Sequence, residues 1–226
     1  MFAVIFEVQP KAERWDDYLA TAKLLRPEIE QIRGFIDNER YRSLRTEGRL
    51  LSLSTWADEK AVVRWRTQAR HHGAQEAGRF EVFQDYHLRV GEICADTRVP
   101  AGQQLREQRF DATETGAAKV VSLSEIDPPA CDPGQIGGLL RLPDIGHGGV
   151  VDREVFSSIT TEGKLIVLVS WRDAEASAAW QPPAATAGVD AFRHRLVRVI
   201  RDYGLTDRRE APQYYPDVPG RGGRDQ

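Results

Sequence analysis

The residues best suited to chemistry lie in the first half of the chain, where Trp65 is followed by His71 and His72. In a helix a spacing of seven places two side chains on one face, so His72 is expected beside Trp65. Histidine titrates near neutral pH and can accept a phenolic proton. A histidine before Gly73 is equally typical of a cation at the negative end of a helix dipole, and His71, rotated off this face, is expected in solvent.

Four further aromatic side chains could form a flat cavity around this pair. They are Trp15, Tyr18, Tyr41 and Tyr86. Aromatic residues at helical or strand spacing are more often part of an ordinary core, so packing is the competing interpretation for all four.

The chain contains one of these segments twice. Residues 34–66 and 149–181 align without a gap, and 13 of the 33 aligned pairs are identical. The identical pairs include turn glycines and tryptophans, such as Gly34 with Gly149 and Trp56 with Trp171. The period is far longer than the roughly 20–50 residues of solenoid repeats, so each copy is expected to be a small domain. Tryptophans that recur in both copies favour a packing role.

The periodicity of the first copy predicts the element order β-α-β-β-α-β. The expected elements are a strand at 2–8 ended by Pro10, a helix at 11–32 with a kink or break near Pro27, strands at 35–44 and 49–56, a helix from Asp58, and a strand at 80–93. Gly48 supplies the positive φ of the hairpin turn between the middle strands. This order is the ferredoxin-like unit, with two helices on one face of a four-stranded antiparallel sheet.

The bare face of each sheet predicts how the copies assemble. Large exposed apolar patches are normally interfaces, so the two sheets are expected to pack against each other. The fold class is therefore α+β, with a first domain at 1–95, a linker at 96–116, a second domain at 117–204 and a partly disordered tail at 205–226. A monomer and a homodimer are both compatible with this fusion. Prolines and glycines predict disorder beyond Tyr215.

The second copy has lost part of the pattern. Prolines and glycines crowd residues 127–138, where the first copy has its long helix, and each costs about 1–3 kcal/mol in a helix interior. Two prolines closely follow Trp180, and nothing corresponds to His71 or His72. We therefore expect one functional pocket, in the first copy. The alternative is a tandem with a purely structural role.

The first copy also carries a recognisable set of residues along its second half. They are Trp56, Asp58-Glu59, Trp65-Arg66, His71-His72, Ala74-Gln75, Gly78-Arg79 and Phe83-x-x-Tyr86-x-x-Arg89-Val90. This arrangement resembles the antibiotic biosynthesis monooxygenase family of the dimeric α+β barrel superfamily, strongly over residues 1–95 and more weakly over 117–204. The resemblance implies two ferredoxin-like units whose sheets form a barrel.

The resemblance also implies a cofactor-independent monooxygenase, which oxidises a small phenolic or polycyclic aromatic molecule with dioxygen and without metal or flavin. An electron-rich phenolate can itself reduce dioxygen, so the protein need only deprotonate it and hold the anion. By resemblance Trp65 lines the pocket, His71 takes the place of a family tyrosine, and Arg89 is the arginine of the last strand. Ala61 stands where the family has a substrate-orienting asparagine.

Two other functions remain open. Haem-degrading relatives use a histidine about ten positions after the tryptophan and an asparagine on the first strand. This chain has Gln75 there and no asparagine at residues 2–9, so haem ligation by His71 or His72 would need a shifted register. The same fold also occurs in proteins that only bind small aromatic molecules or act in stress responses.

Composition excludes several classes of protein. The 226 residues are 41% hydrophobic and 29% charged, as in soluble globular proteins, and no apolar run approaches the roughly 18 residues of a membrane span. A net charge of -3 gives no basic footprint for nucleic acid. The N-terminus lacks the basic start of a signal peptide, and two cysteines are too few for a disulfide framework or a structural zinc site. We therefore expect a cytoplasmic protein.

Overall fold

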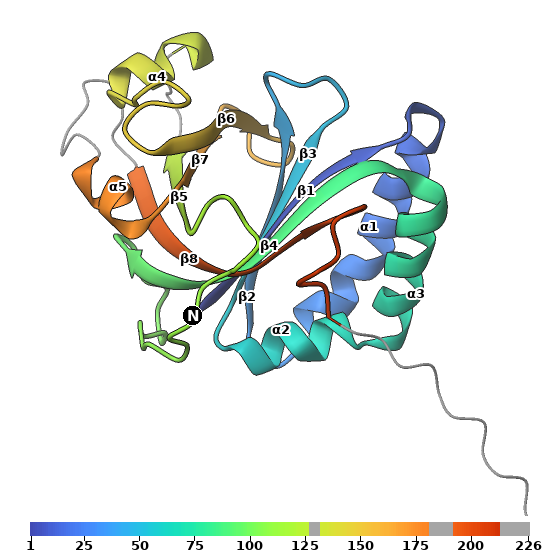
Figure 1. The fold of residues 1–226 in the computed structure, drawn as a ribbon. Helices are drawn as coiled ribbons and strands as arrows, with labels where there is room; N and C mark the ends of the chain where they lie inside the picture. The colour runs from blue at the N-terminus through green and yellow to red at the C-terminus, as the bar shows by residue number, and fades with distance from the viewer. Residues whose placement is uncertain (127–131, 181–191, 213–226) are drawn as a thin grey trace, which may run out of the picture.

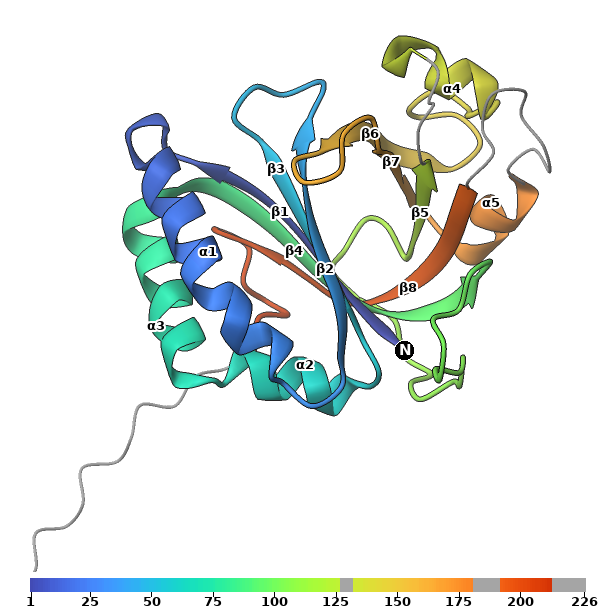
Figure 2. The same ribbon diagram turned by 180° about the vertical axis from the view of Figure 1, so that it is seen from behind.

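Eight antiparallel strands close into a barrel with helices on its outside (Figures 1 and 2). The computed structural model describes residues 1–126, 132–180 and 192–212. Around the barrel the strands follow the order β1-β3-β2-β6-β7-β5-β8-β4, with the four strands of each copy side by side. The predicted α+β class and the joining of two ferredoxin-like sheets into a barrel are confirmed.

The first copy forms the predicted order of elements. They are β1 (Phe2–Pro10), η1 (Ala12–Arg14), α1 (Trp15–Glu30), β2 (Phe35–Ser43), β3 (Leu50–Trp56), α2 (Glu59–Arg66), α3 (Ala69–Ala77), η2 (Gly78–Val82) and β4 (Phe83–Asp96). Pro27 lies inside α1, which is not broken there and ends at Glu30. The last strand begins later than predicted, because residues 78–82 form a π-helical turn before it.

The second copy keeps its strands and has only short helices in the described residues. Its elements are β5 (Val120–Ile126), η3 (Pro133–Gln135), α4 (Ile136–Leu139), β6 (Val150–Ser158), β7 (Leu165–Trp171), α5 (Ala174–Ala179) and β8 (Phe192–Gly204). The predicted loss of the long first helix leaves the four-residue α4. The expected effects of the prolines after Trp180 and of the tail beyond Tyr215 concern residues outside the described ranges.

Two ladders join the copies into one barrel. A short ladder pairs β2 with β6, from Tyr41 opposite Ser158 to Ser43 opposite Phe156. A long ladder pairs β4 with β8. The inward faces of both sheets therefore share one apolar core, which includes Ile5, Leu53, Leu123, Phe156 and Leu168.

The outward faces of the strands carry the helices. In Figure 1, α1, α2 and α3 cover the first copy, whereas α4 and α5 lie on the side of the second. Trp56 and Trp171 are fully buried in these outer layers. The ring centroid of Trp56 lies 5.3 Å from that of Phe35, and the ring centroid of Trp171 lies 5.6 Å from that of Trp180. Their recurrence thus reflects packing. Among the described residues, no helix is long and apolar enough to cross a membrane.

A buried arginine closes one end of the barrel core. Arg89, only 2% exposed, donates to Glu7 of its own copy and to Ser170 Oγ of the other copy at 2.7 Å. Arg49 approaches the same glutamate at 3.7 Å. Burying a charge costs free energy unless the group is paired and hydrogen-bonded. The guanidinium of Arg89 in the first copy therefore depends on the Ser170 hydroxyl of the second.

The opposite end repeats this arrangement with the roles exchanged. Arg195, 1% exposed, donates to Glu125 of its own copy and to Thr55 Oγ1 of the first copy at 3.0 Å. Lys164, which aligns with Arg49, pairs with the same glutamate at 2.9 Å. The two copies are therefore related by an approximate two-fold axis, and each contributes to the buried polar network of the other.

The repeated glycines lie where the chain passes close to the second helix of each copy, just before the middle strands. Gly34 and Gly149 have φ angles of 94° and 79°. A Cβ atom on Gly34 would lie 2.7 Å from the Cβ of Ala61, and one on Gly149 would lie 2.3 Å from that of Ala176. Only glycine relieves both the backbone strain and the contact with the helix.

The second helix of each copy begins at a repeated aspartate. Asp58 accepts a hydrogen bond from the backbone N–H of Ala61 at 2.7 Å, and Asp173 accepts one from Ala176 at 2.8 Å. Each carboxylate satisfies a backbone donor that the first helical turn leaves without a partner. The predicted start of the helix at Asp58 is confirmed.

We predict that Gly34→Ala lowers the free energy of unfolding more than Gly48→Ala. Both glycines have positive φ, but nothing lies within 4 Å of a Cβ on Gly48. Gly48→Ala, the control, should therefore lose only the cost of a positive φ, about 1–2 kcal/mol. Gly34→Ala should lose about 1–3 kcal/mol more, because its new methyl group overpacks against Ala61. Urea denaturation measures both variants, and equal losses would show that the contact with Ala61 carries no cost.

We also predict that Arg89→Met destabilises the fold by about 3–5 kcal/mol, because it leaves Glu7 buried without its closest cation. Adding Glu7→Leu should restore much of this loss, since the second change removes the uncompensated charge. Denaturant midpoints of the single and double variants test the point. A double variant less stable than Arg89→Met would contradict it.

Candidate functional site

Trp65 and His71 form a stacked pair at the junction of α2 and α3. Their ring centroids are 4.0 Å apart and the ring planes differ by 13°. The His71 Nδ1 atom lies 2.8 Å from the carbonyl oxygen of Trp65. Because a carbonyl oxygen only accepts, Nδ1 carries the proton, and the neutral ring keeps its lone pair on Nε2.

A break in the helix creates this stack. The helix expected to run from Asp58 past His72 ends at Arg66, and α3 begins at Ala69. The side chain of Gln68 caps the new helix by accepting from the backbone N–H of His71 at 2.7 Å. The prediction that His72 lies beside Trp65 is therefore wrong, because it is His71 that stacks on Trp65.

Burial changes the acid-base behaviour of His71. Its ring is largely removed from water, which lowers its pKa to about 4 even though the bond to the Trp65 carbonyl oxygen favours the charged form. The imidazole is therefore neutral at pH 7. The expectation that His71 faces solvent is wrong. His72 is half-buried on α3.

Three of the predicted binding residues meet in a second aromatic cluster, between α1 and the sheet. Trp15, Tyr18 and Tyr86 pack together with Phe6 and Phe83. Phe83 lies 5.9 Å from the Tyr18 ring and 6.0 Å from the Tyr86 ring, with the ring planes steeply inclined. Burial raises the pKa of Tyr18. These edge-to-face contacts are typical of a packed core.

Tyr41 and Arg89 lie on the opposite, inward face of the sheet. Tyr41 belongs to the barrel core and donates to Glu39 at 3.0 Å. It lines a cavity of about 350 Å³ near the Glu125 end of the barrel. Arg89 belongs to the buried pair with Glu7. The structure thus separates these two residues from the helix layer that holds Trp65.

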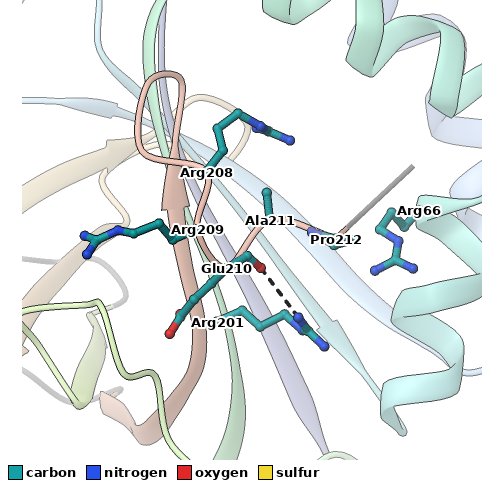
Figure 3. Close-up of a pocket in the computed structure, with 7 residues that line it drawn as sticks. All are labelled: Arg66, Arg201, Arg208, Arg209, Glu210, Ala211 and Pro212. Carbon is teal, nitrogen blue, oxygen red and sulfur yellow. Dashed lines mark hydrogen bonds between the residues drawn. The ribbon is translucent and has the colours of Figure 1, made fainter. Parts of the chain in front are cut away.

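A second cavity lies at the surface of the helix layer. Its volume is about 500 Å³. Its lining comes from α2, β8 and the segment after β8, and consists of Arg66, Arg201, Arg208, Arg209, Glu210, Ala211 and Pro212 (Figure 3). We call this space the arginine cavity. The segment after β8 lies on the same side of the barrel as α1 and α3 (Figures 1 and 2).

Sequence reasoning missed the arginine cavity. Arg66 precedes the other three arginines by more than 130 positions in the chain, and it meets them only because β8 pairs with β4. The one available signal was the density of arginines in residues 193–209, in a chain whose net charge is -3. These arginines fall in the predicted second domain and in the tail that follows it. Among the described residues, no group of three or more His, Cys, Asp or Glu side chains could hold a metal ion.

We predict that the buried ring of His71 lowers the free energy of unfolding in mild acid. Its pKa is about 4 in the folded chain and near 6.5 when unfolded, so between these values the unfolded state binds a proton that the folded state does not. Stability contributed by the neutral ring is present above pH 6.5 and is lost as the pH falls towards 4. His194, with the same shift from burial, acts in the same direction.

Urea unfolding at pH 7 and pH 5 tests this prediction. The wild-type chain should lose roughly 1–2 kcal/mol more between the two pH values than His71→Asn. His147→Asn, at an exposed histidine, is the control and should behave as wild type. An unchanged pH dependence in His71→Asn would contradict the assignment of a low pKa to His71.

Comparison with known proteins places the chain in a family. The family model described as antibiotic biosynthesis monooxygenase matches residues 1–77. The chain is 44% identical over 222 residues to "Jasmonate monooxygenase ABM" of Pyricularia oryzae, a match that covers 96% of this chain and 99% of the relative. It is 30% identical over 92 residues to the uncharacterized protein YqjZ of Bacillus subtilis, covering 41% of this chain and 78% of that protein.

Solved structures agree on the fold. The chain superposes on an aldoxime dehydratase crystallised with butyraldoxime, with a TM-score of 0.54 and 11% identity over 88% of this chain and 79% of the other. At this identity the likeness concerns the fold alone. The expected kinship is borne out by the full-length relative and by the family match to the first copy. The chain therefore belongs to the antibiotic biosynthesis monooxygenase family.

Proposed function

We propose that the protein is a monooxygenase that oxidises a small organic carboxylate, jasmonate or an analogue of it, with dioxygen. The observation that carries this proposal is the likeness to a jasmonate monooxygenase over 96% of the chain, a share that includes both copies. A cavity with a cationic lining suits an anionic substrate. The phenolic or polycyclic aromatic substrate implied by the Trp65 helix is the second candidate, because the stacked Trp65 and His71 rings could bind a flat molecule.

The electrons that the reaction needs limit its chemistry. When one atom of dioxygen enters the substrate, the other is reduced to water by two electrons and two protons. In a cofactor-independent reaction the substrate supplies the two electrons and the two protons. A methylene group then becomes a carbonyl group, and one water is released. Hydroxylation of a single C–H bond would instead need an external two-electron donor such as a reduced nicotinamide. The product therefore identifies the electron source.

His71 is the residue of this chain best suited to accept a proton. Its neutral ring is fixed by the Nδ1 bond to the Trp65 carbonyl oxygen, which leaves Nε2 as an acceptor. A pKa of about 4 makes it a weak base, so it suits a substrate whose O–H or C–H bond is already acidic. His72, beside it on α3, is the alternative base. Trp65 orients His71 and offers a flat surface to the substrate.

We predict that the purified chain consumes dioxygen with jasmonate, and that His71→Ala lowers kcat by about 10²–10⁴-fold, the usual contribution of a general base. Trp65→Phe should lower it less, because a smaller ring still packs against His71. His72→Ala tests the alternative base, and His147→Ala, at an exposed loop position of the second copy, is the control.

Oxygen uptake and mass spectrometry of the product measure the outcome. Gain of one oxygen with loss of two hydrogens indicates that the substrate supplied the electrons, whereas simple gain of oxygen indicates an added reductant. No uptake with jasmonate but uptake with dihydroxynaphthalenes or anthrones would move the proposal to the phenolic class. Tight binding without turnover would favour a binding module, and a Soret band on adding haem would favour a haem protein.

A further inference from the structure

We propose that the arginine cavity is a carboxylate-binding site, in which the guanidinium groups of Arg66, Arg201 and Arg208 hold the acid group of a small organic anion. This inference rests on the proposed function for the identity of the anion, and on the geometry below for the site itself. Its volume of about 500 Å³ lies within the usual range of sites for small molecules.

The three guanidinium groups have no carboxylate partner among the described residues. Arg201 donates at 3.5 Å to the backbone oxygen of Glu210, and Arg208 donates to the hydroxyl of Tyr86. Figure 3 shows Arg66 and Arg201 extending towards the same opening from different elements. Three cations around one cavity repel one another, and an anion between them removes this cost.

Arg209 differs from the other three arginines and provides an internal comparison. Its guanidinium pairs with Asp207 at 2.5 Å, both side chains are at least half exposed, and in Figure 3 it points to the side opposite Arg66. Its charge is already balanced and screened by water. The three other guanidinium groups therefore form the anion-binding part of the lining.

Arg208 is held in place by two tyrosines. It donates to Tyr86, and its guanidinium lies 5.5 Å from the centre of the Tyr203 ring. Tyr203 is buried, which raises its pKa to about 12 and keeps it neutral. A planar guanidinium fixed in this way is ready to bind both oxygens of a carboxylate. Tyr86, which the sequence predicts as a substrate-binding residue, positions Arg208 in this proposal.

The carboxylate of Glu210 anchors the segment that carries Arg208. It accepts from Thr113 Oγ1 at 2.7 Å, from the backbone N–H of Glu114 at 2.7 Å and from that of Thr115 at 3.1 Å. It also accepts from the backbone N–H of Asp202 at 2.7 Å. Burial opposes ionisation, but these bonds hold the pKa of Glu210 below its usual value.

Glu210 is therefore a positioning residue, whose carboxylate oxygens accept from residues 113–115 and 202. The lining keeps a net positive charge, because four arginines share it with this one glutamate. Thr113 and Thr115 belong to the connection between the copies. The same bonds thus tie the C-terminal segment to that connection and fix one wall of the cavity.

The second copy supplies most of this site. A register shift opposite Val90 and Gly91 leaves Ile200 as the extra residue of β8 and turns Arg201 to the outer face. Beside it, Ile200 packs in the same cluster as Trp65. The cavity is thus shared: α2 of the first copy contributes Arg66, and the end of the second contributes the rest.

Binding measured without turnover tests the site. Calorimetry under anaerobic conditions should show that the full chain binds jasmonate at least tenfold more tightly than its uncharged methyl ester. Arg201→Gln and Arg208→Gln should each weaken binding of the acid about tenfold and leave binding of the ester unchanged. Arg209→Gln is the matched control and should bind both as wild type.

The outcomes separate this inference from the proposed function. Thermal unfolding first establishes which variants remain folded. Arginine-dependent binding of the acid without oxygen uptake would overturn the monooxygenase proposal and support the site. Turnover of jasmonate with an unchanged KM in Arg201→Gln and Arg208→Gln would overturn the site and leave the activity standing. Equal affinity of the wild type for acid and ester, or no binding of the acid, would also overturn the site.

Discussion

The buried arginine at each end of the barrel is the interaction on which the rest of the structure depends. Arg89 and Arg195 each pair with a glutamate of their own copy and donate to a hydroxyl of the other. A charge this deeply buried is tolerated only when its hydrogen bonds are complete. Neither copy can complete them alone, so each copy needs the other to bury its charged end of the barrel.

This constraint leaves the outside of the barrel as the part in which the two copies differ most. The interior holds an apolar core with charged networks at its ends, and side chains such as Ile5 and Leu123 pack within it. The outer faces are free to differ between the copies. The first retains three helices and the stacked pair of Trp65 and His71, whereas the second has short helices in the described residues.

The second copy is nevertheless more than a scaffold. Its last strand pairs with β4 along the barrel, and the segment beyond it covers the helix side of the first copy. Arg201 and Arg208 reach the arginine cavity by this route. The second copy can therefore have short helices in the described residues and still keep β8. Its helices lie on its own side of the barrel, whereas β8 and the segment after it line the cavity on the side of the first copy.

The sequence by itself determined the repeat, the order of elements, the cap at Asp58 and the pairing of two sheets, because turn glycines, helix caps and apolar periodicity act over a few residues. It also pointed to Trp65 and the histidines after it. Only the tertiary structure decided which histidine stacks on Trp65. The break between α2 and α3 interrupts the helical spacing that would have placed His72 beside it. The tertiary structure also decided where Arg89 points, and that arginines from distant positions meet in one cavity. Those outcomes depend on strand register and chain closure, which no local pattern encodes.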